Sequence, residues 1–313
     1  MIDEKCGRVV KGLGGLYETL VTEGGEHTRY LTRAKGSLKR DEEKVLVGDL
    51  VKLRIDSEVQ GGSVISEVLP RKNELIRPPL ANLDILFIVF AAAKPAPVYE
   101  TLDKLIAIAE HNSITPVCVI TKADLNPTLA DEHKRIYGRI GIDCFTTSSH
   151  SGEGVEALSK YIRENLADKT AAFAGASGVG KSTLLNSLFP TLALATAEIS
   201  RKIERGRHTT RHVEIFEIPT DSGVGYLADT PGFSLIDFAR FDFFGLEDLP
   251  GAFREFSPYL DRCKYADCTH VGEGECDCAV VRAVKDGAIS PSRHASYAAI
   301  REVLKAKKSY SDK

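Results

Sequence analysis

The sequence has 313 residues, of which 43% are hydrophobic and 27% charged, with a formal net charge of −3. This composition is typical of a globular protein with two or three domains, and the small net charge gives no overall sign of a nucleic-acid partner. No apolar run approaches the roughly 18 residues that a membrane helix needs. The N-terminal residues include early acids and lack the apolar core of an export signal, so we expect a cytoplasmic protein with no membrane partner.

Residues 1–70 are expected to form a small β-barrel. Short runs rich in Val, Leu and Ile alternate with glycine-containing turns, and no helical pattern of useful length interrupts them. Their number and length favour the five-stranded OB type, although a generic barrel without a ligand fits the same pattern. Two segments, 29–40 and 282–308, are basic; taken alone, each is typical of a solvated face.

After Pro78 and Pro79, apolar runs alternate with helical patterns, which is typical of a parallel, doubly wound α/β sheet. Strands are expected within 84–92, 116–121, 142–148, 170–175 and 224–228, and helices within 101–112, 129–140, 155–165 and from 181. Beyond residue 233 the chain is aromatic and irregular, and two helices are expected between 279 and 308. The expected domains are a barrel over 1–70, an α/β domain over 71–235 and a cysteine-containing helical domain over 236–313.

The segment GASGVGKS matches the phosphate-binding loop G-x-x-x-x-G-K-[ST] at every required position. It follows an apolar strand and opens a helix, so backbone N–H groups and the helix N-terminus would face phosphate oxygens. Lys181 would act catalytically on the β- and γ-phosphates, and Ser182 would ligate Mg²⁺. A fortuitous glycine-rich turn is the alternative. The expected nucleotide contacts are Gly175, Ser177, Gly178, Val179, Gly180, Lys181, Ser182 and Thr183.

A second motif, TKAD, follows the buried strand PVCVI and would select the base. Asp124 can accept hydrogen bonds from the ring N–H and the exocyclic amine of guanine, whereas adenine would leave this carboxylate unpaired. The alkyl stem of Lys122 would cover the base, and the loop that contains Ser148 could support it with backbone N–H groups. Alone, T-K-x-D is more typical of a charged loop; beside a phosphate-binding loop it favours guanine.

Two further segments resemble the switch regions of GTPases. Asp229, at the end of an apolar strand, would hold Mg²⁺ through water, and Gly232 would offer its N–H to the γ-phosphate. In the segment RGRHTTR, Thr209 or Thr210 could close on Mg²⁺; a basic surface loop is the alternative. Every motif lies just past the carboxyl end of an expected strand, where doubly wound sheets bind ligands.

The order of these motifs is unusual, because TKAD precedes the phosphate-binding loop. A parallel sheet tolerates such a permutation when the original ends are close and exposed, so the sequence predicts a circularly permuted GTPase domain. The segment after Gly232 leads directly into the C-terminal domain, which could carry the nucleotide state there.

Four of the seven cysteines fall within sixteen residues and surround a histidine, which indicates a metal site in a reducing compartment. Three thiolates and one imidazole make a closed, structural zinc site without catalytic function. Free buried cysteines are the alternative. The candidates are Cys263, Cys268, His270, and either Cys276 or Cys278 as the fourth ligand.

The whole chain resembles the RsgA (YjeQ) family of GTPases that depend on the small ribosomal subunit. The resemblance rests on GASGVGKST, GRHTTRHVE, DTPGF and C-x4-C-x-H, and on VLPRKNELIRPPLANLD and CAVVRAVKDGAIS. It implies GTP hydrolysis stimulated by the small subunit during its late maturation, with the barrel and zinc domains contacting 16S rRNA. It also implies Mg²⁺ with GTP or GDP, one structural zinc and a monomer.

The resemblance makes His208 a candidate for positioning water, and Phe233 stands where many GTPases carry the glutamine of that role. Thr121 replaces the usual Asn, which predicts a weaker tether to the phosphate-binding loop. In the family, the last zinc ligand directly precedes an Ala-Val helix start, which favours Cys278. The family's usual spacing between the histidine and the last ligand, counted from His270, selects Cys276 instead.

Two other functions fit the sequence. One is a GTP-regulated protein that acts on another structured RNA or in translation. The other is a zinc-containing nucleic-acid-binding module with a vestigial nucleotide site, against which the intact Asp124, Lys181, Ser182 and Asp229 argue.

Overall fold

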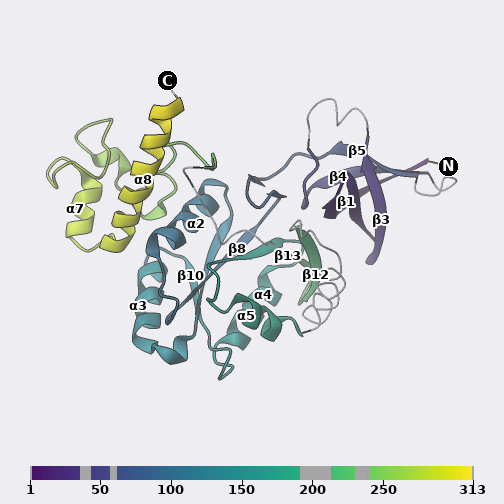
Figure 1. The fold of residues 1–313 in the computed structure, drawn as a ribbon, viewed down its shortest axis with the longest axis horizontal. Helices are drawn as coiled ribbons and strands as arrows, with labels where there is room; N and C mark the ends of the chain where they lie inside the picture. The colour runs from purple at the N-terminus through teal and green to yellow at the C-terminus, as the bar shows by residue number, and fades with distance from the viewer. Residues whose placement is uncertain are drawn as a thin grey trace. The chain divides into compact units, whose positions relative to one another are not determined.

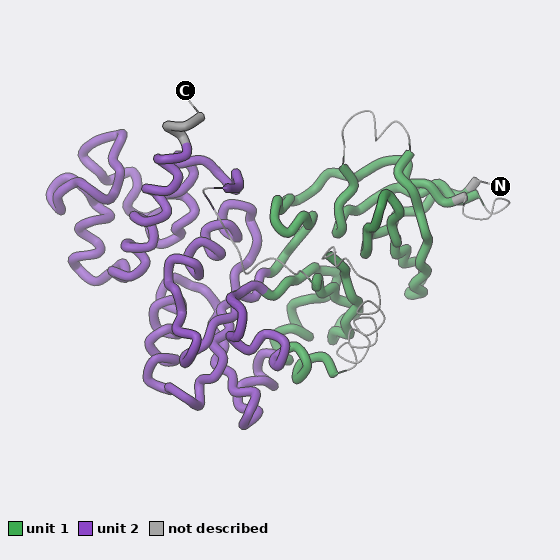
Figure 2. Tube along the Cα trace, viewed as in Figure 1, with its two compact units in different colours: residues 1–85, 159–173, 185–233 green, residues 86–158, 174–184, 234–313 purple. Residues whose placement is uncertain are grey.

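The computed structural model describes residues 2–35, 44–56, 62–190, 213–229, 238 and 240–311. The chain forms two compact units, each built from segments distant in sequence (Figure 2). Unit 1 contains residues 1–85, 159–173 and 185–233, and unit 2 contains residues 86–158, 174–184 and 234–313. No helix in the described part is long and apolar enough to cross a membrane.

A five-stranded barrel occupies the N-terminal part of unit 1 (Figure 1). Its strands are β1 (Ile2–Leu13), β2 (Leu16–Glu23), β3 (Glu26–Ala34), β4 (Leu50–Asp56) and β5 (Gly62–Val68). They pair in the closed order β1-β2-β3-β5-β4-β1, in which only β3 and β5 run parallel. This barrel confirms the predicted OB-type fold.

The barrel closes because β1 is long enough to pair with two strands, and a bulge between Val9 and Lys11 bends it. Alternate residues point inward, as expected for strands with one buried face. The core consists of Val9, Val21, Val45, Val51, Leu53 and Ile65. A short hairpin, β6 (Glu74–Leu75) and β7 (Leu80–Ala81), follows the barrel.

The barrel continues into a second set of strands in unit 1. These are β11 (Thr170–Ala174), β12 (Glu214–Thr220) and β13 (Gly223–Asp229). β11 and β13 are parallel, whereas β12 forms an antiparallel hairpin with β13 and pairs with β1 through Lys11 and Glu214. No strand was predicted at β12, because its polar and apolar residues do not follow a clean alternation.

Unit 2 contains strands covered by helices, as the alternating pattern predicted. The elements are β8 (Ile85–Ala91), α2 (Tyr99–His111), β9 (Thr115–Thr121), η1 (Ala123–Leu125), α3 (Pro127–Gly138) and β10 (Asp143–Thr146). The strands neighbour one another in the order β10-β9-β8, and α2 and α3 contact β9. Two helices, α4 (Val155–Asn165) and α5 (Lys181–Leu188), contribute residues to both units.

The C-terminal part of unit 2 is irregular before it becomes helical. Its elements are η2 (Arg254–Phe256), η3 (Leu260–Arg262), α7 (Ala279–Lys285) and α8 (Pro291–Ser311), which confirms the predicted pair of closing helices. Phe253, Phe256 and Tyr297 form its aromatic core. α8 packs on α2 (Figure 1), so the region is joined to the strand layer of its own unit.

Candidate nucleotide site and metal centre

The phosphate-binding loop joins β11 to α5, the context that its mechanism requires. At Gly175 the backbone has φ +150°, and a Cβ there would lie 2.1 Å from the carbonyl oxygen of Val89. Only glycine therefore fits where the loop leaves the strand. Ser177 and Gly178 are exposed along the loop, and Ser182 and Thr183 are exposed on the first turn of α5.

Lys181 is the first residue of α5, and its side chain turns back onto the phosphate-binding loop. Its ammonium group donates hydrogen bonds to the carbonyl oxygens of Gly175 (2.6 Å) and Ala176 (2.7 Å). Partial burial lowers the pKa of Lys181. These carbonyl oxygens hold the charged end of the side chain at the centre of the loop, where phosphate oxygens would meet it.

The TKAD motif is tied to the phosphate-binding loop by two side chains. The buried hydroxyl of Thr121 donates to the carbonyl oxygen of Val179 (2.5 Å) and lies 3.2 Å from that of Phe90. Lys122 donates to the carbonyl oxygens of Gly178 (2.9 Å) and Lys94 (2.6 Å). Thr121 stands where many GTPases have Asn, and this difference was expected to weaken the tether. The Thr121 hydroxyl makes that tether here, and Lys122 makes a second connection.

The residues that would face the base lie at the ends of β9 and β10. Asp124 is exposed in η1, immediately after the tether. The N–H groups of Thr147 and Ser148 donate to the carbonyl oxygens of Ile120 (2.7 Å) and Glu153 (2.9 Å). These two amides hold the loop together, so the expected backbone support for the base would have to come from a neighbour such as Ser149.

The sequence predicted the loop that contains Thr147 but gave no role to its side chain, and it did not single out Lys94. Lys94 follows β8 and holds the Lys122 ammonium group through its carbonyl oxygen. Thr147 is buried, and its hydroxyl oxygen has no hydrogen-bond partner among the described residues. Both residues follow the carboxyl end of a strand, so the strand-end rule that located the motifs could also have found Lys94.

Two of the residues expected to hold Mg²⁺ are described: Ser182, on the first turn of α5, and Asp229. Asp229 ends β13 in unit 1, directly opposite Glu214 of β12. Desolvation and the negative charge of Glu214 raise the pKa of Asp229, while Lys11 of the barrel pairs with Glu214 at 2.8 Å. His208, Thr209, Thr210 and Gly232 lie outside the described residues, as does the segment that was expected to link Gly232 to the C-terminal domain.

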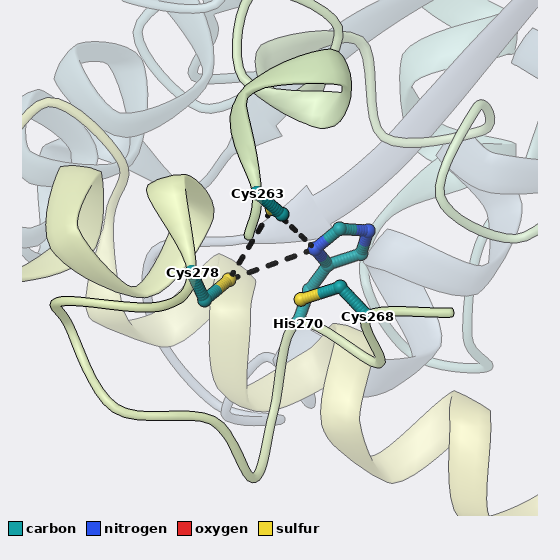
Figure 3. A group of neighbouring side chains, drawn as sticks. All are labelled: Cys263, Cys268, His270 and Cys278. Carbon is teal, nitrogen blue, oxygen red and sulfur yellow. Dashed lines mark hydrogen bonds between the residues drawn. The ribbon is translucent and has the colours of Figure 1, made fainter. Parts of the chain in front are cut away.

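Four metal-binding side chains gather in the C-terminal part of unit 2 (Figure 3). They are Cys263, Cys268, His270 and Cys278, and their ligand atoms all lie within 4.8 Å of one another. The Nδ1 atom of His270 lies 3.6 Å from the sulfurs of Cys263 and Cys278, which are 3.9 Å apart. Cys276 is exposed and is not a member of this group.

The donor set fits zinc. Tetrahedral Zn²⁺, with bonds of about 2.3 Å to sulfur and about 2.0 Å to nitrogen, requires sulfurs about 3.8 Å apart and sulfur–nitrogen distances of about 3.5 Å. Burial raises the pKa of Cys268 to about 12 and also raises the pKa of Cys278. The thiolates of Cys268 and Cys278 would therefore need a bound cation to stay charged here.

The loop that presents His270 is held by Glu273. Its carboxylate accepts hydrogen bonds from the N–H groups of Thr269 (2.7 Å) and Val271 (3.2 Å), and from the Thr269 hydroxyl (3.0 Å). Although burial opposes this, the hydrogen bonds from Thr269 and Val271 lower the pKa of Glu273 to about 2. This ordered loop holds the imidazole in a buried position, where His270 adopts φ +60°.

Together, a guanine-type motif upstream of the phosphate-binding loop, an N-terminal barrel and a Cys3His group define a circularly permuted P-loop GTPase with a candidate zinc site. The chain belongs to the RsgA GTPase family: the model of that family matches residues 68–239, and the model of the RsgA N-terminal domain matches residues 6–62.

Named relatives cover nearly the whole chain. A protein of Caldanaerobacter subterraneus subsp. tengcongensis called small ribosomal subunit biogenesis GTPase RsgA is 41% identical, over 96% of each chain. A protein of the same name from Agathobacter rectalis is 38% identical, over 97% of this chain and 99% of its own.

Two solved structures have the same fold. YjeQ from Thermotoga maritima has a TM-score of 0.78 and 32% identity, over 96% of this chain and 99% of its own. YloQ, described as a circularly permuted GTPase, has a TM-score of 0.77 and 32% identity, over 97% of this chain and 96% of its own. The predicted permutation and GTPase assignment are therefore confirmed.

Proposed function

We propose that this GTPase acts in the late maturation of the small ribosomal subunit and that the subunit stimulates its hydrolysis of GTP. The observation that carries the proposal is the match, over 96–97% of the chain, to relatives named small ribosomal subunit biogenesis GTPase. The match includes the barrel and the Cys3His region as well as the nucleotide-binding motifs.

In the proposed mechanism, the phosphate-binding loop and Lys181 hold the β- and γ-phosphates of GTP, while Asp124 selects guanine. Mg²⁺, when bound with GTP, neutralises charge that develops on the phosphates; Ser182 and Asp229 would hold it, with Thr209 or Thr210. His208 would position water, and Gly232 would donate its N–H to the γ-phosphate. Slow intrinsic hydrolysis that is completed on the subunit suits a chain that has Phe233 where many GTPases carry glutamine.

The remaining parts of the proposal concern the two added domains. The barrel over 1–70 and the zinc domain over 236–313 would contact 16S rRNA, with the α/β domain over 71–235 between them in sequence. One structural Zn²⁺ would be held by Cys263, Cys268, His270 and Cys278, with no open position for catalysis. We propose that the protein works as a monomer in the cytoplasm.

The decisive experiment measures GTP hydrolysis with and without purified small ribosomal subunits. We expect at least about tenfold stimulation, equal to about 1.4 kcal/mol in the barrier, and no hydrolysis by Lys181→Ala in either condition. Lys160→Ala, which changes a surface lysine of α4, should behave as the wild type. Absence of stimulation by the subunit would remove the ribosomal role while leaving the GTPase assignment intact.

Cosedimentation separates this function from action on another RNA. Binding to small subunits with a non-hydrolysable GTP analogue, and its loss with GDP, supports the proposal. Equal binding in both states, or preference for an unrelated structured RNA, favours a GTP-regulated RNA-binding protein instead.

A further inference from the structure

Two cysteines outside the metal group lie opposite each other in the strand layer of unit 2. Cys118 of β9 and Cys144 of β10 are direct partners in a parallel ladder. Partners in such a ladder point to the same face, and neighbouring strands are about 4.8 Å apart. That spacing lies within the range of Cα separations, about 4.4–6.8 Å, that a disulfide can bridge.

The two thiols differ in access. Cys118 is completely buried, whereas Cys144 is partly exposed, and its sulfur lies 3.3 Å from the carbonyl oxygen of Ile142. Burial, together with a hydrogen bond to Cys144, raises the pKa of Cys118 well above its ordinary value. A reagent in solution would therefore reach Cys144 first, with Cys118 directly behind it as the second thiol.

The position of the pair connects it to guanine binding. Thr121 is three residues after Cys118 and ends β9, while Thr147 is three residues after Cys144 and follows β10. These two residues make the contacts that hold the TKAD loop: Thr121 with Val179, and the Thr147 N–H with Ile120. A disulfide between β9 and β10 would therefore disturb both of these hydrogen bonds.

We infer that Cys144 and Cys118 form a peroxide-sensitive dithiol whose oxidation to a disulfide weakens guanine-nucleotide binding. The Cys144 thiolate attacks one oxygen of a hydroperoxide; the O–O bond breaks, and a sulfenic acid forms, with hydroxide or alkoxide as the leaving group. The Cys118 sulfur then attacks the sulfenic sulfur and expels water as its own proton leaves. Overall, two thiols lose two electrons and two protons, and hydrogen peroxide is reduced to two molecules of water.

The expected loss of affinity follows from geometry. The Cα atoms of disulfide-bonded residues usually lie about 5.5–6 Å apart, farther than the spacing of about 4.8 Å between neighbouring strands, so β10 is expected to shift relative to β9. The Thr147–Ile120 and Thr121–Val179 contacts then change together. We expect at least a fivefold loss in GDP affinity, the lower end of typical coupling between sites. Oxidation of Cys144 and Cys118 does not depend on the proposed ribosomal role, whereas the measurement of GDP affinity rests on the GTPase assignment.

The test treats the full-length, zinc-loaded protein with hydrogen peroxide, blocks the remaining thiols and digests the protein with trypsin without reduction. Peptides 105–122 and 140–160 carry one cysteine each, so a disulfide appears as their summed mass less two hydrogen atoms. Cys144→Ser should abolish this species, whereas Cys6→Ser, which removes an exposed thiol of β1, should not. In Cys118→Ala, dimedone should trap the sulfenic acid on Cys144.

Binding of a fluorescent GDP analogue, before and after oxidation and after reduction with dithiothreitol, measures the consequence. Reversible loss of affinity in the wild type and in Cys6→Ser, but not in Cys144→Ser, supports the inference. A pair that stays reduced at peroxide concentrations that oxidise Cys6 overturns it. A disulfide that forms with unchanged GDP affinity overturns the connection to nucleotide binding.

Discussion

A buried network of charged side chains joins the C-terminal region of unit 2 to α2, and it should set the free energy of local opening of α8 and α2. Arg293 of α8 donates to Asp103 of α2 (2.6 Å) and, through two nitrogens, to Glu255 of η2 (2.7 and 3.1 Å). Its guanidinium also lies over the Phe253 ring, 4.5 Å from the centroid. The three charged side chains are 1%, 1% and 5% exposed, so their interactions are not screened by water.

Replacing Arg293 with methionine fills similar space but leaves two buried carboxylates without a cation. Breaking a buried pair in this way typically costs about 3–5 kcal/mol, chiefly through the uncompensated charge. The free energy of local opening of α8 and α2 should fall by this amount, up to the stability of the unit. Amide hydrogen exchange in both helices should then be faster by about two to almost four orders of magnitude, at 1.36 kcal/mol for each tenfold change.

The effect must also depend on pH. Burial raises the pKa of Asp103 above its ordinary value even beside Arg293, and the loss of Arg293 removes the positive charge that opposes this shift. Between the unfolded and the folded pKa values, the folded variant binds more protons than the unfolded chain. Its stability therefore falls as pH rises through this interval. The difference from the wild type should be largest near pH 8 and should shrink as pH falls toward 4.

Hydrogen exchange measured at pH 5 and pH 8, corrected for intrinsic rates, tests this prediction. The triple variant Asp103→Asn, Glu255→Gln, Arg293→Met should recover much of the lost stability, because no buried charge remains. Lys305→Met, at an exposed position of α8, should change stability by less than about 0.5 kcal/mol. A loss below about 1 kcal/mol in Arg293→Met, or one that is equal at both pH values, would refute the reasoning.

Four further predictions concern the nucleotide and metal sites. Asp124→Asn should weaken GDP binding at least about 100-fold and favour xanthine nucleotides, because its amide N–H would face the guanine amine; unchanged GDP affinity by titration would exclude Asp124 from base recognition. Thr121→Val should lower GDP affinity about five- to tenfold by leaving the Val179 carbonyl oxygen without its donor, whereas Thr121→Ser should retain it. Asp229→Asn should stabilise the nucleotide-free protein at neutral pH, because desolvation and a neighbouring carboxylate raise the pKa of Asp229, and should weaken Mg²⁺-dependent GTP binding. This gain should vanish below about pH 4, where the unfolded chain is also protonated; a gain that is independent of pH in urea unfolding would contradict the cause. Cys278→Ser should lose zinc in a colorimetric metal assay, while Cys276→Ser should keep it; the opposite result would reverse the ligand assignment.

The local pattern of the sequence was enough for much of the fold. Alternating apolar residues and glycine turns predicted the barrel, and the helical spacing of apolar residues predicted α2, α3, α4 and α8. These features depend on interactions within short segments, and hydrophobic periodicity reports such interactions directly. β12 was missed because its own residues do not alternate cleanly. Its pairing with β1 and β13 supplies the stabilisation that this pattern does not reveal.

For the site, the sequence by itself determined the chemistry: a phosphate-binding loop, a guanine-type motif upstream of it and a set of five possible zinc ligands. Motifs carry this information because each needs fixed residue types at short spacing. Only the tertiary structure decided which groups meet. It placed Cys278 rather than Cys276 beside His270, brought the Thr121 hydroxyl to Val179 and set Cys118 opposite Cys144. Such contacts depend on loop paths and strand registers, which are set by packing across the whole unit rather than by neighbouring residues.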